Sequence, residues 1–196
     1  MEEGTKVTPK FTTEFLDRQV PGDPRIDELK KWCDQFTQSG LMPSYEGGVY
    51  GNLSFRLKPE NRFIITSSGM KETSAAESFV KVDRVDLEQK IVYAAGQREP
   101  SSESMFHYLI YQKRPEVNAV FHGHCQKLLD NQARLGLVST EWEKPYGTME
   151  LADQIMTVLG KNDFLIIKNH GFISLGKNMA AAGDLALKTM ARCAFD

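Results

Sequence analysis

Two histidines separated by one residue constrain the fold more than any other feature of this chain. An apolar run at residues 117–121 has the pattern of a buried strand and leads directly into His122-Gly123-His124. Side chains two positions apart on a strand point to the same face of a sheet, so these two imidazoles should lie together. A third histidine, His170, also follows an apolar run, at residues 164–167. The pattern predicts a sheet at whose edge imidazoles gather.

The rest of the chain mixes strand and helix patterns without a regular alternation. A helix is predicted from Asp23-Pro24 to Gly40, since the first pair is typical of a helix start and the glycine of a stop. Further helices are predicted from residues 100–102 to 112 or 113, from Thr148, and from Asn178 onward. Strands are predicted at residues 53–57, 62–66, 79–82 and 91–93, the first two as a hairpin. These elements indicate an α/β fold class with a mixed or antiparallel sheet covered by helices.

Length and charge bound the possible functions. A chain of 196 residues is most simply one domain, which we expect at residues 23–196 after a polar extension at residues 1–22. The net charge of −2 gives no bulk electrostatic case for nucleic acid or an anionic membrane. Apolar runs are too short to span a bilayer, and 3 scattered cysteines favour a reducing cytoplasm over a disulfide framework.

The histidine spacing points to a metal site. Two imidazoles on one face of a strand, with a third from another strand end, would make a three-histidine site with an open fourth position, as in catalytic zinc sites. The alternative is that these are hydrogen-bonded histidines of the interior. The remaining histidine, His107, lies in the middle of a predicted helix among apolar residues and is interpreted as structural.

A carboxylate and three small polar segments complete the candidate chemistry. Glu103 lies in the first turn of a predicted helix, where the helix dipole alone would favour it, so a functional role requires that this helix start faces the metal. The segments Gly51-Asn52, Ser68-Gly69 and Ser101-Ser102 lie at the ends of elements. Each can offer backbone N–H groups or hydroxyls to a phosphate, although singly each is also ordinary turn or cap chemistry.

Taken in order, these segments resemble the class II aldolase/adducin family. The matching elements are Gly51-Asn52-Leu53-Ser54, residues 65–69 with Ser67 in place of a proline, Pro100-Ser101-Ser102-Glu103, residues 118–124 with both histidines, residues 146–151, and Asn169-His170-Gly171. The resemblance covers about residues 25–193 and is closest to bacterial L-fuculose-phosphate aldolases. It implies a single domain with a central, mainly antiparallel sheet flanked by helices, and a homotetramer with active sites at subunit interfaces.

The resemblance also implies roles for individual residues. His122, His124 and His170 would bind Zn²⁺ or another divalent transition metal, and Glu103 would be the catalytic acid/base. The substrate phosphate would be bound by Gly51, Asn52, Ser68, Gly69, Ser101 and Ser102. The implied reaction is cleavage of a small phosphorylated ketose through a zinc-stabilised enediolate.

Related reactions on the same scaffold remain open. Sugar-phosphate 4-epimerases typically carry aspartate where this chain has Glu103, whereas sugar-acid phosphate decarboxylases can carry glutamate. Methylthioribulose-phosphate dehydratases match the Ser-Ser-Glu segment less well, and an adducin-like interaction module would lack the metal histidines. The aldolases also use two further tyrosines, one across the interface and one from a C-terminal tail. Neither has a clear counterpart, since Tyr146 belongs to a different matched element.

Overall fold

A nine-stranded sheet runs through the centre of the protein, in a computed structural model that describes residues 10–58 and 60–194. Its strand order is β1-β7-β6-β5-β4-β8-β11-β10-β9. The β1–β7 and β10–β9 pairs are parallel and the other pairs are antiparallel, which confirms the mainly antiparallel sheet. The strands are β1 (Thr12–Asp17), β4 (Gly51–Leu57), β5 (Arg62–Thr66), β6 (Phe79–Asp86), β7 (Ile91–Ala95), β8 (Ala119–Gly123), β9 (Val138–Ser139), β10 (Phe164–Ile167) and β11 (Gly171–Gly176). A separate small ribbon joins β2 (Ser44–Tyr45) to β3 (Gly48–Val49).

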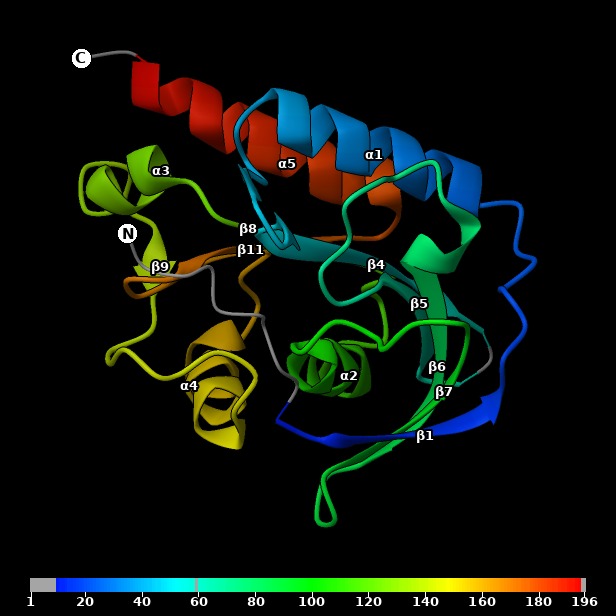
Figure 1. Cartoon of the computed structure of the whole chain (residues 1–196). Coiled ribbons are helices and arrows are strands. Elements are labelled where there is room, and N and C mark those ends of the chain that lie inside the picture. The colour runs from blue at the N-terminus through cyan, green and yellow to red at the C-terminus, as the bar shows by residue number, and fades with distance from the viewer. Residues whose placement is uncertain (1–9, 59, 195–196) are drawn as a thin grey trace.

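Helices cover both faces of the sheet (Figure 1). Helices α1 (Ile26–Gln38) and α5 (Met179–Ala191) lie side by side on one face, and α2 (Ser104–Lys113) and α4 (Met149–Leu159) lie on the other. The short helix α3 (Gln126–Asp130) follows β8, and 3-10 turns lie at Ala76–Ser78 and Arg192–Ala194. None of the helices within the described ranges is long and apolar enough to cross a membrane.

Strand alternation divides the apolar interior into two layers. On β4, Leu53 and Phe55 point into the core beneath α1 and α5. Residues of β5, including Phe63 and Ile65, point into the core beneath α2 and α4. Because successive side chains of a strand alternate between faces, residues 52, 54 and 56 of β4 must face α2. This second face carries the polar side chains of the site.

Two of the predicted helix starts are confirmed by their capping side chains. The Thr148 hydroxyl accepts a hydrogen bond from the Leu151 amide (3.2 Å) and begins α4, and the Asn178 side chain accepts one from Ala181 (2.8 Å) and begins α5. Two helices begin later than predicted. Asp23 instead accepts a hydrogen bond from the Arg25 amide (2.9 Å) in a turn before α1, and α2 begins after Glu103.

The predicted N-terminal extension contains a strand that the sequence did not indicate. Strand β1 adds to the sheet edge by parallel pairing with β7, Thr12 facing Ile91. Its side chains are mostly exposed or half-buried, so it lacks the alternating apolar pattern by which a strand is recognised. Residues Thr12–Asp17 of the predicted extension therefore belong to the sheet. Residues 1–9 lie outside the described ranges.

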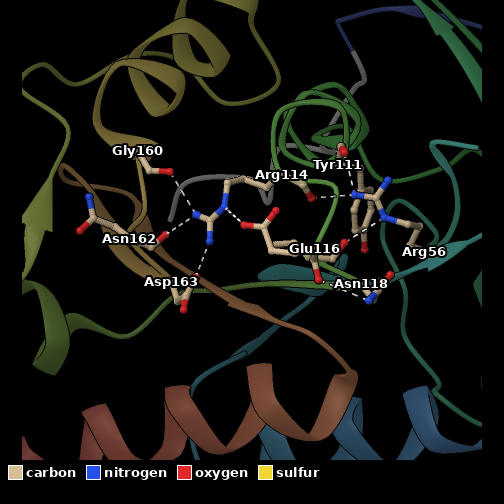
Figure 2. Close-up of polar contacts among 9 residues, drawn as sticks. Arg56, Tyr111, Arg114, Glu116, Asn118, Gly160, Asn162 and Asp163 are labelled. Carbon is tan, nitrogen blue, oxygen red and sulfur yellow. Dashed lines mark hydrogen bonds and ion pairs between the residues drawn. The ribbon is translucent and has the colours of Figure 1, made fainter.

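Two arginines fix the C-terminal end of α2 to its neighbours (Figure 2). The buried Arg56 of β4 donates hydrogen bonds to the carbonyls of Tyr111 (2.6 Å), Arg114 (2.9 Å) and Val117 (2.8 Å). Arg114 in turn contacts the carbonyl of Gly160, just after α4, at 3.2 Å. Carbonyls at a helix end lack partners within the helix, so these contacts stabilise the ends of α2 and α4 together.

Candidate active site

The candidate site lies where three neighbouring central strands meet the start of α2. Strands β4 and β11 begin at the sheet edge where β8 ends, because both are antiparallel to β8. The register places Asn52 of β4 opposite His122 of β8, and Phe172 of β11 opposite Gly123. His170 occupies the turn just before β11. The sequence prediction that strand ends gather the histidines is therefore confirmed.

The three histidines form a compact cluster. The Nε2 atoms of His122 and His124 are 3.1 Å apart, and one ligand nitrogen from each of the three lies within 4.8 Å of the others. Ring centroids of His170 lie 5.1 Å from His122 and 4.8 Å from His124. His122 is fully buried, whereas the other two are partly exposed, so the cluster is open on one side.

A glycine allows this approach. A Cβ atom added at Gly171 would lie 2.3 Å from the Gly123 carbonyl oxygen and 3.0 Å from Cε1 of His122. The preceding turn contains Asn169 at φ 54°, a left-handed conformation that asparagine tolerates better than most residues. The sequence Asn169-His170-Gly171 thus lets the β10–β11 turn bring His170 against β8.

The hydrogen bond from His122 Nδ1 leaves its Nε2 atom available to a cation. Its Nδ1 atom lies 2.8 Å from the Phe172 carbonyl oxygen and must carry the proton in that contact, because a carbonyl only accepts. In a neutral ring Nε2 is then an unprotonated acceptor, and it lies 3.1 Å from both His124 Nε2 and Glu103 Oε2. Such a convergence requires a proton or a metal ion between the acceptors. Nitrogens bound to one tetrahedral zinc would lie about 3.3 Å apart, since Zn–N bonds are about 2.0–2.1 Å.

Glu103 lies directly beside the histidines, at the N-cap position of α2. Its buried carboxylate accepts a hydrogen bond from Asn52 Nδ2 (2.8 Å), and its other oxygen lies 3.3 Å from His170 Nε2. The helix start therefore faces the histidine cluster, which was the condition for a functional role of Glu103.

The cluster is strongly coupled electrostatically. Burial opposes ionisation of Glu103, but the charges of His122, His170 and His124 outweigh it and hold its pKa well below the ordinary value. Burial likewise disfavours the charged form of His122, yet the Glu103 carboxylate raises its pKa overall. Burial, reinforced by His122 and His170, lowers the pKa of His124 to about 3. Without a metal, Glu103 and His122 therefore each favour the charged form of the other.

The small polar segments converge on one cavity. Its lining includes Glu103, His124 and His170. It also includes all six residues that were expected to bind phosphate, namely Gly51, Asn52, Ser68, Gly69, Ser101 and Ser102. The Ser101 amide donates to the Thr66 carbonyl (3.1 Å) and the Ser68 amide donates to that of Glu99 (2.9 Å). These contacts hold the end of β5 against the segment before α2. Each segment alone could have been ordinary turn or cap structure, but all three share one cavity with the histidines.

The cavity also contains side chains for which the sequence predicted no role. Tyr45, Tyr50, Lys144 and Tyr146 line it. The ring of Tyr50 stacks on His124 with centroids 5.3 Å apart, and Tyr45 stacks on Tyr50 at 4.4 Å. Tyr45 and Tyr50 belong to a glycine-rich segment with no periodicity, so no pattern in the sequence pointed to them.

Fold and site together define an α/β domain with a metal-competent histidine cluster and a buried carboxylate in one cavity. Residues 27–195 match the model of the Class II Aldolase and Adducin N-terminal domain, and the chain belongs to this family.

Individual relatives carry several activities. The chain is 33% identical over 152 residues to an L-fuculose phosphate aldolase of Methanococcus vannielii, covering 70% of this chain and 78% of that one. It is 27% identical over 175 residues to a 3-oxo-tetronate 4-phosphate decarboxylase of Haemophilus influenzae, covering 79% and 80% of the two chains. A solved L-fuculose 1-phosphate aldolase superposes with a TM-score of 0.72 at 22% identity, covering 89% of this chain and 85% of the other. The structural likeness supports the fold.

Proposed function

We propose that this protein is a metal-dependent aldolase-type lyase that cleaves a small phosphorylated ketose, similar to fuculose phosphate. The observation that carries the proposal is the Glu103 carboxylate, which lies within 3.3 Å of two of the three clustered histidines and beside the phosphate-binding candidates. The similarity to enzymes named L-fuculose phosphate aldolase supports the substrate class. A homotetramer with interface active sites and a cytoplasmic location belong to the same proposal.

The three histidines and Glu103 would have different roles in the reaction. His122, His124 and His170 would hold a divalent ion, with zinc the first choice for three imidazoles, and when bound it would polarise the substrate carbonyl and stabilise the enediolate charge. Glu103 would move a proton to or from the carbon beside that carbonyl. Its lowered pKa keeps it ionised at neutral pH, which is the form that a general base must have.

The opposite part of the cavity would fix the phosphate. The hydroxyls of Ser68, Ser101 and Ser102 would bind it, together with polar groups of Gly51, Asn52 and Gly69, whereas the Ser68 and Ser101 amides already donate within the fold. Binding a remote phosphate orients the reacting end of the substrate against Glu103, which lowers the entropic part of the barrier.

A decarboxylase of a sugar-acid phosphate is the second candidate. The relative named 3-oxo-tetronate 4-phosphate decarboxylase favours it, because removal of carbon dioxide beside a carbonyl also develops charge on that oxygen. A panel of ketose phosphates and keto-acid phosphates separates the two. An aldehyde product supports the aldolase, whereas carbon dioxide without an aldehyde supports the decarboxylase. Epimers without cleavage would support an epimerase, and a metal-free, inactive protein would support an interaction module.

Two variants test the residue roles. His122→Ala should lose most of the bound metal and the turnover, because it removes the central ligand. Glu103→Gln should keep the metal but lower proton exchange between dihydroxyacetone phosphate and solvent by about 10²–10⁴-fold. Metal analysis and NMR detection of deuterium incorporation measure both. Full metal content in His122→Ala would refute the ligand set, and undiminished exchange in Glu103→Gln would remove Glu103 from its role.

A further inference from the structure

A chain of buried hydrogen bonds leads from Glu103 into the interior between β4 and α2. Asn52 Nδ2 lies 2.8 Å from Glu103 Oε2, and Asn52 Oδ1 lies 2.6 Å from His107 Nε2. His107 Nδ1 lies 2.7 Å from the Ser54 hydroxyl, which lies 2.8 Å from the Tyr111 hydroxyl. Asn52 is 3% exposed, and Ser54, His107 and Tyr111 are fully buried.

The spacing of the two elements explains why these side chains interleave. Glu103, His107 and Tyr111 are four residues apart along α2, and Asn52 and Ser54 are two apart along β4. Four helical residues rise about 6 Å and two strand residues about 6.6–6.8 Å, so the two rows stay in register. Arg56, the next residue on this face of β4, ends the row with its guanidinium 4.7 Å from the Tyr111 ring (Figure 2).

The direction of every hydrogen bond in the chain follows from the first. The Asn52 amide nitrogen donates to Glu103, so the amide oxygen, which can only accept, faces His107. The proton of His107 is then on Nε2, and the bare Nδ1 accepts from the Ser54 hydroxyl. The Ser54 oxygen in turn accepts from Tyr111. Burial lowers the pKa of His107 to about 3, consistent with one proton on the ring.

We propose that His107 is a positioning residue that orients the Asn52 amide and, through it, the Glu103 carboxylate for proton transfer. The catalytic part of this proposal rests on the proposed function of Glu103. If the Asn52 amide rotated by half a turn, its oxygen would face the carboxylate and its NH₂ would face the Nε2–H of His107. Both contacts would then be repulsive, so the Nε2–H tautomer of His107 holds Asn52 in one orientation, and a Ser54 hydroxyl that donates to Nδ1 supports that tautomer.

The tautomer can be tested without any reaction. The chain has 4 histidines, so long-range ¹H–¹⁵N spectra of histidine-labelled protein are simple to interpret. Loss of one ring system in His107→Gln assigns its signals. We expect a protonated Nε2 and an unprotonated, hydrogen-bonded Nδ1 for His107 at neutral pH, with and without added zinc. A protonated Nδ1, or two protonated nitrogens, would overturn the proposal.

Kinetics test the consequence for Glu103. His107→Leu removes the donor to Asn52, whereas the amide of His107→Gln can replace Nε2–H. We expect the leucine variant to lower kcat for proton exchange on dihydroxyacetone phosphate about 10- to 100-fold, with metal content unchanged and KM changed less than about threefold. The glutamine variant should recover most of kcat.

The control is Ile110→Val, which trims a buried side chain of α2 away from the hydrogen bonds. Equal kcat losses in His107→Leu, His107→Gln and Ile110→Val would reduce His107 to a packing role and overturn the proposal, as would full activity of the leucine variant. If His107→Leu does not fold, the glutamine variant and the tautomer spectra still decide. Absence of exchange in the wild-type protein would refute the proposed function, while the spectra would still support or overturn the orientation of Asn52.

Discussion

At the scale of single residues, the site depends on a position where no side chain fits. Gly171 lies against β8 so closely that a Cβ would contact the Gly123 carbonyl and the His122 ring. We expect Gly171→Ala to destabilise the protein by about 1–3 kcal/mol, because backbone must shift to admit the methyl group. Zinc affinity should fall as well, since His170 moves away from His122. Urea unfolding and a chelator competition assay measure the two effects.

Gly22→Ala is the matched control, because an added Cβ there would meet no heavy atom within 4 Å. It should change the unfolding free energy by less than about 0.5 kcal/mol. Wild-type stability and zinc affinity in Gly171→Ala would show that the β10–β11 turn can adjust freely.

The sequence predicted the gathering of the histidines but not the arrangement behind Glu103. His122, His124 and His170 follow apolar runs. An apolar run that stops is a local sequence signal for the end of a strand. His107 resembles a core histidine in sequence, because nothing near it in the chain shows which strand lies opposite. Only the pairing of β4 with β8, and the position of α2 over that face, place Asn52 between His107 and Glu103.

At the scale of elements, Arg56 joins strand β4 to the C-terminal end of α2. Its guanidinium binds three backbone carbonyls and the Asn61 side chain, and it is 5% exposed. Arg56→Met should destabilise the protein by about 3–5 kcal/mol, because these buried acceptors lose their donors. Urea unfolding monitored by circular dichroism measures the change.

Arg84→Met provides the comparison, since Arg84 is an exposed arginine of β6 whose guanidinium lies 3.4 Å from the Tyr93 ring centroid. It should cost less than about 1 kcal/mol. Equal losses in the two variants would contradict the role assigned to Arg56.

Two helix starts were predictable from single capping residues, whereas the Asp23-Pro24 start was placed too early because Asp23 caps a turn before α1. Thr148 and Asn178 begin helices because their own side chains accept the capping hydrogen bonds. Strand β1 was missed because an edge strand with exposed side chains needs no apolar alternation. The strand order was also beyond prediction, since it depends on pairings between residues as distant as Asn52 and His122.

At the scale of the whole molecule, metal binding and stability should depend jointly on pH. In the metal-free protein the Glu103 carboxylate raises the pKa of His122, so His122 is protonated below that value. A metal ligand must be unprotonated, and binding therefore displaces a proton wherever His122 is protonated. Zinc affinity should fall as pH decreases through the raised pKa, and the zinc-induced increase in Tm should be smaller at about pH 6 than at about pH 8.

Calorimetry with and without zinc at the two pH values measures this difference. The matched variant is Glu103→Gln, which removes the carboxylate and should lower the pKa of His122, so the pH dependence should weaken. An equal increase in Tm at both pH values in the wild-type protein would refute the linkage.

The position of the site in the middle of the sheet has a consequence for how it can be lost. Asn52, His122 and His170 come from distant parts of the chain and meet only on the paired strands β4, β8 and β11. Central strands of a sheet open in the most cooperative and least frequent fluctuations, whereas edges and termini fray. We therefore expect the site to persist through partial unfolding of β1 or β9, and to vanish only when the entire domain loses its structure.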